Sequence, residues 1–305
     1  MPDSLFEDDF CAMRHRVKLI ANPIAGGDAR TAIAQAVTFL EARGARVALV
    51  LTARRGDAEN AARAARGVDF DLVIAAGGDG TLNEVANGLA GTGLPLAFVP
   101  LGTANVMALE MGLPQGIAAA CRVALDGESR RVALAEVNGR YFLMMAGIGF
   151  DAAAVRAVSS PLKRKFGKLA YVVAGVQAWL LNRPVALQLQ TEAGELVPVW
   201  HLVISNIRYY GGRFQLAPQN GLEKPLLTAC LVDQPGRMAL LLFWLRIALR
   251  GHLLGPVRRI DAREFSLYGA SVPVQVDGDA SGETPAEQWL KISCHAQRLS
   301  LIFPP

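Results

Sequence analysis

The strongest constraint on the fold is an alternation of short apolar segments and helix-like segments over the first ~125 residues. The strand-like segments are residues 17–21, 47–52, 71–76 and 95–100. The helix-like segments are residues 29–43, 57–66 and 82–89. Repeated strand–helix units of this length predict a parallel, doubly wound sheet, in which ligands bind at the carboxyl ends of the strands. Three loops rich in Gly, Asn or Thr follow strands at that edge.

The pattern changes after about residue 128, where β-like segments with turns between them dominate, as in a sandwich. Asn138 and Gly139 between two apolar segments predict a hairpin. We therefore expect an α/β domain over residues 1–128 and an all-β, sandwich-like domain over residues 129–296. Residues 297–305 form a predicted terminal strand that can return to the first domain.

The sharpest chemical signal is GGDGTLNEV, residues 77–85, which directly follows a predicted strand and opens a helix. Its three glycines let backbone N–H groups face a ligand, and the helix N-terminus adds partial positive charge, so the segment predicts a phosphate cradle. Asp79 is placed to act through Mg²⁺, and Thr81 can offer a hydroxyl to a phosphate oxygen. The structural alternative is a tight turn whose aspartate only caps the helix. Neither a P-loop lysine motif nor GxGxxG occurs in the chain.

With three further segments, the whole chain resembles the diacylglycerol kinase-like lipid kinases, which include sphingosine and ceramide kinases and small bacterial relatives. These segments are NPIAGG at 22–27, PLGTAN at 100–105 and VDGD at 276–279. NPIAGG and GGDGTLNEV also recur in NAD kinases, whereas PLGTAN and VDGD make the lipid-kinase resemblance more specific. The resemblance implies an α/β nucleotide-binding domain followed by a β-sandwich lipid domain.

The resemblance also implies ATP and Mg²⁺ as cofactors, with Asp79 as the central acidic residue at the phosphates. Asp279 stands where the family usually has a glutamate general base, and an aspartate can do the same chemistry with a shorter reach. A hairpin turn is the structural alternative for residues 277–279. The residues expected to bind the nucleotide are Asn22, Pro23, Gly26, Thr52, Gly77, Gly78, Gly80, Thr81, Asn83, Glu84, Gly102, Thr103 and Asn105.

Three positions depart from the family pattern. Val106 and Ala133 stand where relatives often have aspartates of a magnesium and water network. Lys224 replaces the aspartate of a structural magnesium loop, and a cation there removes an oxygen ligand and adds repulsion, so we expect no structural magnesium at this loop. These departures keep open a catalytically weak relative that acts as a nucleotide- or lipid-binding regulator. The other alternative is NAD kinase-like phosphorylation of a soluble nucleotide.

Composition bears on the compartment and the partners. The net charge of +4 suits an anionic membrane surface or phosphorylated ligands and is too small to indicate nucleic acid. The four cysteines have no metal-ligand spacing and are expected to be reduced, as in a cytoplasmic protein. The oligomeric state stays open, with a homodimer among the options.

Two segments bear on membrane contact. A basic cluster, Lys163, Arg164, Lys165 and Lys168, begins a predicted apolar helix over residues 163–181 and can attract anionic headgroups. The most apolar segment, residues 238–249, is shorter than the ~20 residues of a membrane span and favours core packing over membrane insertion. We therefore expect a peripheral enzyme at the inner membrane face, acting on a lipid hydroxyl.

Overall fold

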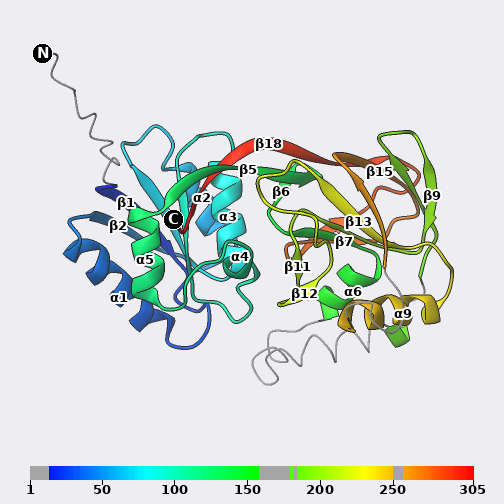
Figure 1. Ribbon diagram of the computed structural model, residues 1–305, viewed down its shortest axis with the longest axis horizontal. Coiled ribbons are helices and arrows are strands. Elements are labelled where there is room, and N and C mark those ends of the chain that lie inside the picture. Colours follow the sequence, from blue (N-terminus) through cyan, green and yellow to red (C-terminus); the bar gives the residue numbers. More distant parts are fainter. Residues whose placement is uncertain (1–13, 158–178, 182–183, 250–256) are drawn as a thin grey trace, which may run out of the picture.

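The computed structural model describes residues 14–157, 179–181, 184–249 and 257–305, and its elements form an α/β half and a β-rich half (Figure 1). In the α/β half the strands are parallel in the order β2-β1-β3-β4. Its elements are β1 (Arg16–Ala21), α1 (Ala29–Ala42), β2 (Arg46–Leu51), α2 (Asp57–Arg63), β3 (Leu72–Gly77), α3 (Asp79–Leu89), β4 (Leu96–Pro100), α4 (Val106–Glu110) and α5 (Ile117–Asp126).

Helices cover both faces of this parallel sheet because successive strand side chains point to opposite faces. On β1, Val17 and Leu19 pack in one cluster with residues of α1 and α5, while Ile20 packs in the other with residues of α2 and α3. Both clusters are fully apolar and buried. The predicted doubly wound sheet is therefore confirmed, and its carboxyl edge lies where β1, β3 and β4 end in glycine-rich loops.

The β-rich half is a sandwich of two sheets. One sheet has six strands in the order β14-β13-β10-β7-β16-β17, and the other is part of a ten-stranded sheet. Side chains of both sheets form one apolar cluster between them, which includes Ile148, Leu189, Ile204 and Phe265. The elements are β5 (Glu128–Val137), β6 (Arg140–Phe142), β7 (Met145–Ile148), α6 (Phe150–Ala157), β8 (Leu187–Thr191), β9 (Leu196–Val199), β10 (His201–Ser205), β11 (Tyr209–Tyr210), β12 (Phe214–Gln215), β13 (Leu227–Val232), α9 (Arg237–Ala248), β14 (Arg258–Ala262), β15 (Glu264–Gly269), β16 (Pro273–Val276), β17 (Asp279–Glu283) and β18 (Leu290–Phe303).

Two long strands join the halves. β18 pairs with β15 and β5 in an antiparallel sense and with β4 in a parallel sense, so the ten-stranded sheet continues from one half into the other (Figure 1). β18 is 14 residues long and begins well before the predicted terminal strand. The register shifts between His295 and Leu299, where Gln297 has a φ of 52°. This irregular polar segment hides the continuity of the strand from pattern analysis.

The hairpin at Asn138 and Gly139 was predicted correctly because few residue types adopt the backbone conformation of its turn. Val137 pairs with Arg140 across Asn138 and Gly139, whose φ values are 53° and 72°, as in a type I′ hairpin. Helix α3 begins at Asp79, three residues before the predicted start, and α5 was not predicted. The basic cluster at residues 163–168 lies outside the described residues. Among the residues described, no helix is long and apolar enough to cross a bilayer.

Candidate active site

The loops that follow β1, β2, β3 and β4 meet at the carboxyl edge of the parallel sheet and are joined by backbone hydrogen bonds. The Asn22 N–H donates to the Ala76 carbonyl at 2.9 Å, and the Thr52 N–H donates to the Ala21 carbonyl at 2.9 Å. The Leu101 N–H donates to the Gly77 carbonyl at 2.7 Å. The sequence-predicted residues on these loops are thus brought together at one edge.

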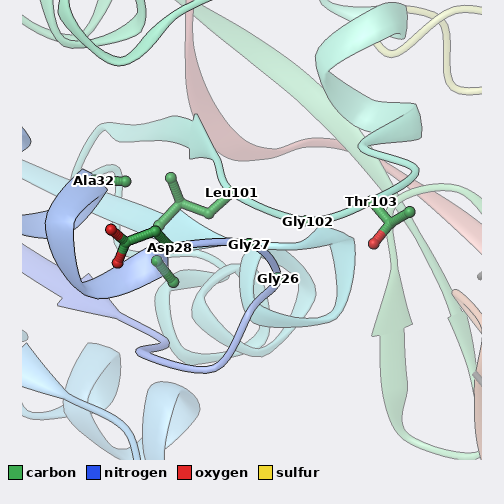
Figure 2. Close-up of a pocket in the computed structure, with 8 residues that line it drawn as sticks. Gly26, Gly27, Asp28, Ala32, Leu101, Gly102 and Thr103 are labelled. Atoms are coloured by element: carbon green, nitrogen blue, oxygen red, sulfur yellow. The ribbon is translucent and has the colours of Figure 1, made fainter. Parts of the chain in front are cut away.

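A pocket of about 360 Å³ opens between the first and fourth of these loops. Its lining includes Gly26, Gly27 and Asp28 on one side and Leu101, Gly102 and Thr103 on the other (Figure 2). Gly26 has a φ of 123°, and a Cβ there would lie 3.3 Å from the Leu101 carbonyl oxygen. Glycine at this position therefore keeps the pocket wall thin and lets the two loops approach.

Asp79 locks the third loop to the fourth. Its Oδ2 accepts a hydrogen bond from the Val106 N–H and its Oδ1 accepts one from the Met107 N–H, both at 3.0 Å. The carboxylate therefore holds the start of α4 as well as lying at the start of its own helix. This structural task was not predicted.

Close backbone contact explains the glycines at the third and fourth loops. A Cβ on Gly102 would lie 2.7 Å from the Gly78 Cα and 2.7 Å from the Asn105 Oδ1. A Cβ on Gly77 would lie 2.5 Å from the Oγ1 of Thr81, whose side chain is buried over that glycine. Asn105 has a φ of 46° and donates from Nδ2 to the Gly102 carbonyl at 2.7 Å. Its buried Oδ1 has no partner among the described residues.

Asn83 and Glu84 on α3 make hydrogen bonds to other elements of the fold. The Glu84 Oε2 accepts a hydrogen bond of 3.2 Å from the Ala58 N–H, so this carboxylate supports the first turn of α2. The Asn83 amide donates to Asp277 in the β-rich half. Both side chains are buried. These structural contacts were not predicted, and the expected nucleotide contacts of the two residues stay a prediction.

Asp279 reaches the third loop from the β-rich half. Its Oδ2 lies 3.8 Å from the position of a Cβ on Gly80, which places the carboxylate over the start of α3. The same oxygen lies 3.5 Å from a guanidinium nitrogen of Arg55 on the loop between β2 and α2. The Asp279 side chain is 45% exposed, so it remains accessible to a ligand. The carboxylate and the glycine loop therefore face each other across the two halves.

Asp277 forms the neighbouring buried contact. Its Oδ1 accepts hydrogen bonds from the N–H groups of Met144 and Met145, each at 2.9 Å, and its Oδ2 accepts from Leu143 at 2.8 Å and from Asn83. Burial raises the pKa of this carboxyl to about 6, against the opposing effect of the four donors. Asp277 therefore anchors the turn before Asp279 to helix α3.

The turn that carries these aspartates is a two-residue hairpin. Val276 pairs with Asp279, and the intervening Asp277 and Gly278 have φ values of 50° and 84°. A type I′ turn favours Asp-Gly at these positions. A hairpin turn over residues 277–279 is therefore compatible with a chemical role for Asp279, because the turn itself points this side chain toward Gly80.

The three positions that depart from the family pattern make the following contacts. Val106 contributes its backbone N–H to Asp79, and the Ala133 N–H donates to the Leu222 carbonyl at 2.8 Å. The Lys224 ammonium donates to the Gln219 carbonyl at 3.2 Å. No group of three or more His, Cys, Asp or Glu side chains within the described ranges could hold a metal ion. The absence of structural magnesium at the Lys224 loop stays a prediction.

Sequence analysis missed Arg55 and the anchoring function of Asp277. The Arg55 contact depends on the approach of the two halves, which no local pattern reports. A second missed contact between the halves is the buried Glu110, which accepts hydrogen bonds from the Arg208 backbone N–H and its Nε, both at 3.1 Å. The only sequence signal for Asp277 was its place in the Asp-Gly turn.

Comparison with known proteins agrees with this geometry. Residues 16–137 match the diacylglycerol kinase catalytic domain, and residues 144–303 match the YegS C-terminal NAD kinase beta sandwich-like domain. The chain is 30% identical over 281 residues to the diacylglycerol kinase of Bacillus subtilis (strain 168), which covers 89% of this chain and 92% of the relative.

Solved structures give the same result. A crystal structure from Bacillus anthracis str. Sterne, assigned to the diacylglycerol kinases, has a TM-score of 0.80 at 25% identity and covers 99% of both chains. The yeast NADH kinase complexed with NADH shares the fold, with a TM-score of 0.51 at 10% identity over 94% of this chain and 82% of the other. The chain is a kinase that belongs to the diacylglycerol kinase-like family of lipid kinases.

Proposed function

We propose that this kinase transfers the γ-phosphoryl group of ATP to a hydroxyl of a diacylglycerol-like or sphingoid membrane lipid. The observation that carries the proposal is the position of Asp279, whose Oδ2 lies 3.8 Å from the Cβ position of Gly80. A carboxylate of the sandwich thus faces a glycine loop at a helix N-terminus. This arrangement suits a proton acceptor beside a phosphate group.

The first and fourth loops suit the phosphates of a nucleotide. The pocket between Gly26 and Gly102 has glycine walls that a Cβ would narrow, and the start of α3 adds the partial positive charge of a helix N-terminus. The Oδ1 of Asn105 is buried and has no hydrogen-bond partner among the described residues. Because it is an acceptor, it suits a hydroxyl or amino group of the nucleotide, not a phosphate oxygen. In this proposal Asn22, Thr52 and Thr103 complete the nucleotide contacts.

Magnesium would be held by Asp79, a carboxylate at the start of α3 whose oxygens are of the kind that Mg²⁺ prefers as ligands. When bound, the ion would neutralise phosphate charge. The protein groups do the rest of the proposed chemistry. Asp279 accepts the proton of the lipid hydroxyl, the hydroxyl oxygen forms the new bond to phosphorus, and the bond from phosphorus to the departing ADP oxygen breaks. Arg55, at 3.5 Å, holds the carboxylate in place.

The proposed setting is peripheral, at the inner face of the membrane, because a lipid hydroxyl must reach Asp279. Two alternative functions predict different results in a turnover assay. A kinase of the NAD kinase type would phosphorylate a soluble nucleotide. A regulator would bind nucleotide or lipid tightly and turn neither over, an outcome for which Val106 and Ala133 are the motivation.

The test is turnover of labelled ATP by the purified protein with a panel of diacylglycerol, a sphingoid base, other lipid alcohols and NAD. Asp279→Asn should lower kcat by roughly 10²-fold or more with little change in the KM for ATP, because only the proton acceptor is lost. Asp126→Asn, which alters an exposed ion pair with Arg43, is the matched control and should keep full activity. Phosphorylation of NAD alone, or full activity of Asp279→Asn, would contradict the proposal.

A further inference from the structure

Helix α9 has two apolar faces, and the described residues cover one of them. Leu240, Phe243 and Ile247 on the inner face are buried. The outer face exposes an apolar stripe of four side chains with relative exposures of 37–63%, namely Met238, Leu241, Leu245 and Leu249, the last of which caps the helix. The sequence expectation of core packing therefore describes the inner face alone.

Arginines flank the apolar stripe on both sides. With 100° per residue the stripe is about 80° wide, and Arg237 and Arg246 lie about 40° and 60° beyond its two edges. Both arginines are partly exposed, and α9 carries no acidic residue. Long cationic side chains at the borders of an apolar helical face are typical of helices that lie in a membrane interface, where the charged ends reach the headgroups.

A second apolar segment lies beside the first turn of α9. Leu180 and Leu181 are 55% and 72% exposed. The preceding Trp179 donates from Nε1 to the Arg237 carbonyl at 3.0 Å, which fixes this segment to α9. The exposed aliphatic surface is therefore larger than one helix face.

The inner face of α9 ties this surface to the sheet that carries Asp279. The ring of Phe243 packs against the imidazole of His201 on β10, with 5.0 Å between the ring centroids. Phe150 of α6 packs on the same imidazole, with 5.9 Å between the ring centroids. β10 and β17 belong to one six-stranded sheet, and Asp279 is the first residue of β17. Helices α6 and α9 lie along the same edge of the β-rich half (Figure 1). Contact made through α9 therefore orients the proposed active site.

We propose that the apolar stripe, with Leu180 and Leu181, docks the protein on an anionic bilayer surface. The aliphatic side chains enter the boundary of the acyl chains, and Arg237 and Arg246 contact lipid phosphates. The proposal deepens the proposed function, on which it rests for its lipid substrate. A second copy of this chain is a poorer occupant, because two α9 helices face to face bring arginines together with no acidic partner on either helix.

The experiment is flotation of the full-length protein with phosphatidylcholine vesicles, with and without 30% phosphatidylglycerol. We expect wild type to bind the anionic vesicles and Leu241→Glu/Leu245→Glu to bind them at least about tenfold more weakly. The matched control is Leu49→Glu/Leu51→Glu, since these side chains are 44% and 51% exposed on β2 of the other half. Arg237→Gln/Arg246→Gln should remove the preference for anionic vesicles.

Thermal melts check that each variant is folded. If Leu241→Glu/Leu245→Glu is not folded, Leu245→Ser replaces it. Turnover is measured in parallel on substrate in detergent micelles, where docking is not needed. Absent turnover with stripe-dependent vesicle binding would refute the proposed function and leave the docking surface standing. Vesicle binding by the double variant equal to wild type would overturn the docking proposal, as would a wild-type dimer that the same variant dissociates.

Discussion

Replacing Asp277 with asparagine tests how one buried carboxylate between the halves contributes to stability. The side chain keeps its shape, but it no longer titrates and one acceptor oxygen becomes an N–H₂ group that faces donors. In the wild type, three backbone N–H groups at residues 143–145 and the Asn83 amide donate to this carboxylate. The carboxylate is nevertheless removed from water, and burial raises its pKa from 3.8 to about 6.

The sign of the pH effect follows from proton binding. The carboxyl loses its proton near pH 3.8 in the unfolded chain and near pH 6 in the folded chain, so the folded chain binds more protons between these values. The contribution of this carboxyl to the free energy of unfolding is therefore largest below pH 3.8 and falls as the pH rises through 6. The shift of about two units corresponds to ~3 kcal/mol.

The assay is denaturant unfolding of wild type and Asp277→Asn at several pH values from about 4 to 7.5. Other carboxyls titrate in both proteins and cancel in the difference. The free energy of unfolding of wild type minus that of the variant should fall by ~2.5 kcal/mol across this range, because the unfolded carboxyl is already partly ionised at pH 4. A difference that stays constant or rises with pH would refute the reasoning, since it would mean that the four donors outweigh the loss of water around the carboxylate.

Two further outcomes are expected. Gly102→Ala should destabilise the fold by ~1–3 kcal/mol and weaken ATP binding in calorimetry, because its Cβ would lie 2.7 Å from the Gly78 Cα, whereas Gly221→Ala, with nothing within 4 Å, should do neither. Titration of the wild type with Mg²⁺ should show no ion bound at the Lys224 loop, where the ammonium donates to the Gln219 carbonyl, and anomalous scattering from Mn²⁺ at that carbonyl would contradict this expectation.

Strict local chemistry made much of the fold predictable. The short apolar segments that form β1 and β3, which are buried along nearly their whole length, and the glycine-rich turns after them identified the parallel sheet and its ligand-binding edge. The Asn138-Gly139 and Asp277-Gly278 turns were recognisable because positive φ at both positions restricts the residue types. These signals depend on a few neighbouring residues, so a single sequence contains them.

Contacts between distant segments were the part that pattern analysis missed. The irregular segment around Gln297 concealed that β18 continues through both halves. The hydrogen bond that Glu84 accepts from the Ala58 N–H of a different helix was not predicted. The Arg55–Asp279 pair joins residues more than two hundred positions apart. No periodicity or spacing reports such a pair, because it depends on how the halves pack.

The three aspartates of the family segments differ in what their surroundings leave them free to do. Asp277 is buried, and each of its oxygens already accepts two hydrogen bonds, so it has no capacity left for a lipid hydroxyl. Each carboxylate oxygen of Asp79 accepts one hydrogen bond from a backbone N–H at the start of α4. Asp279 is 45% exposed and has Arg55 as a partner at 3.5 Å. The proton acceptor is therefore best sought at Asp279, because the buried Asp277 anchors the turn that holds this shorter side chain over Gly80.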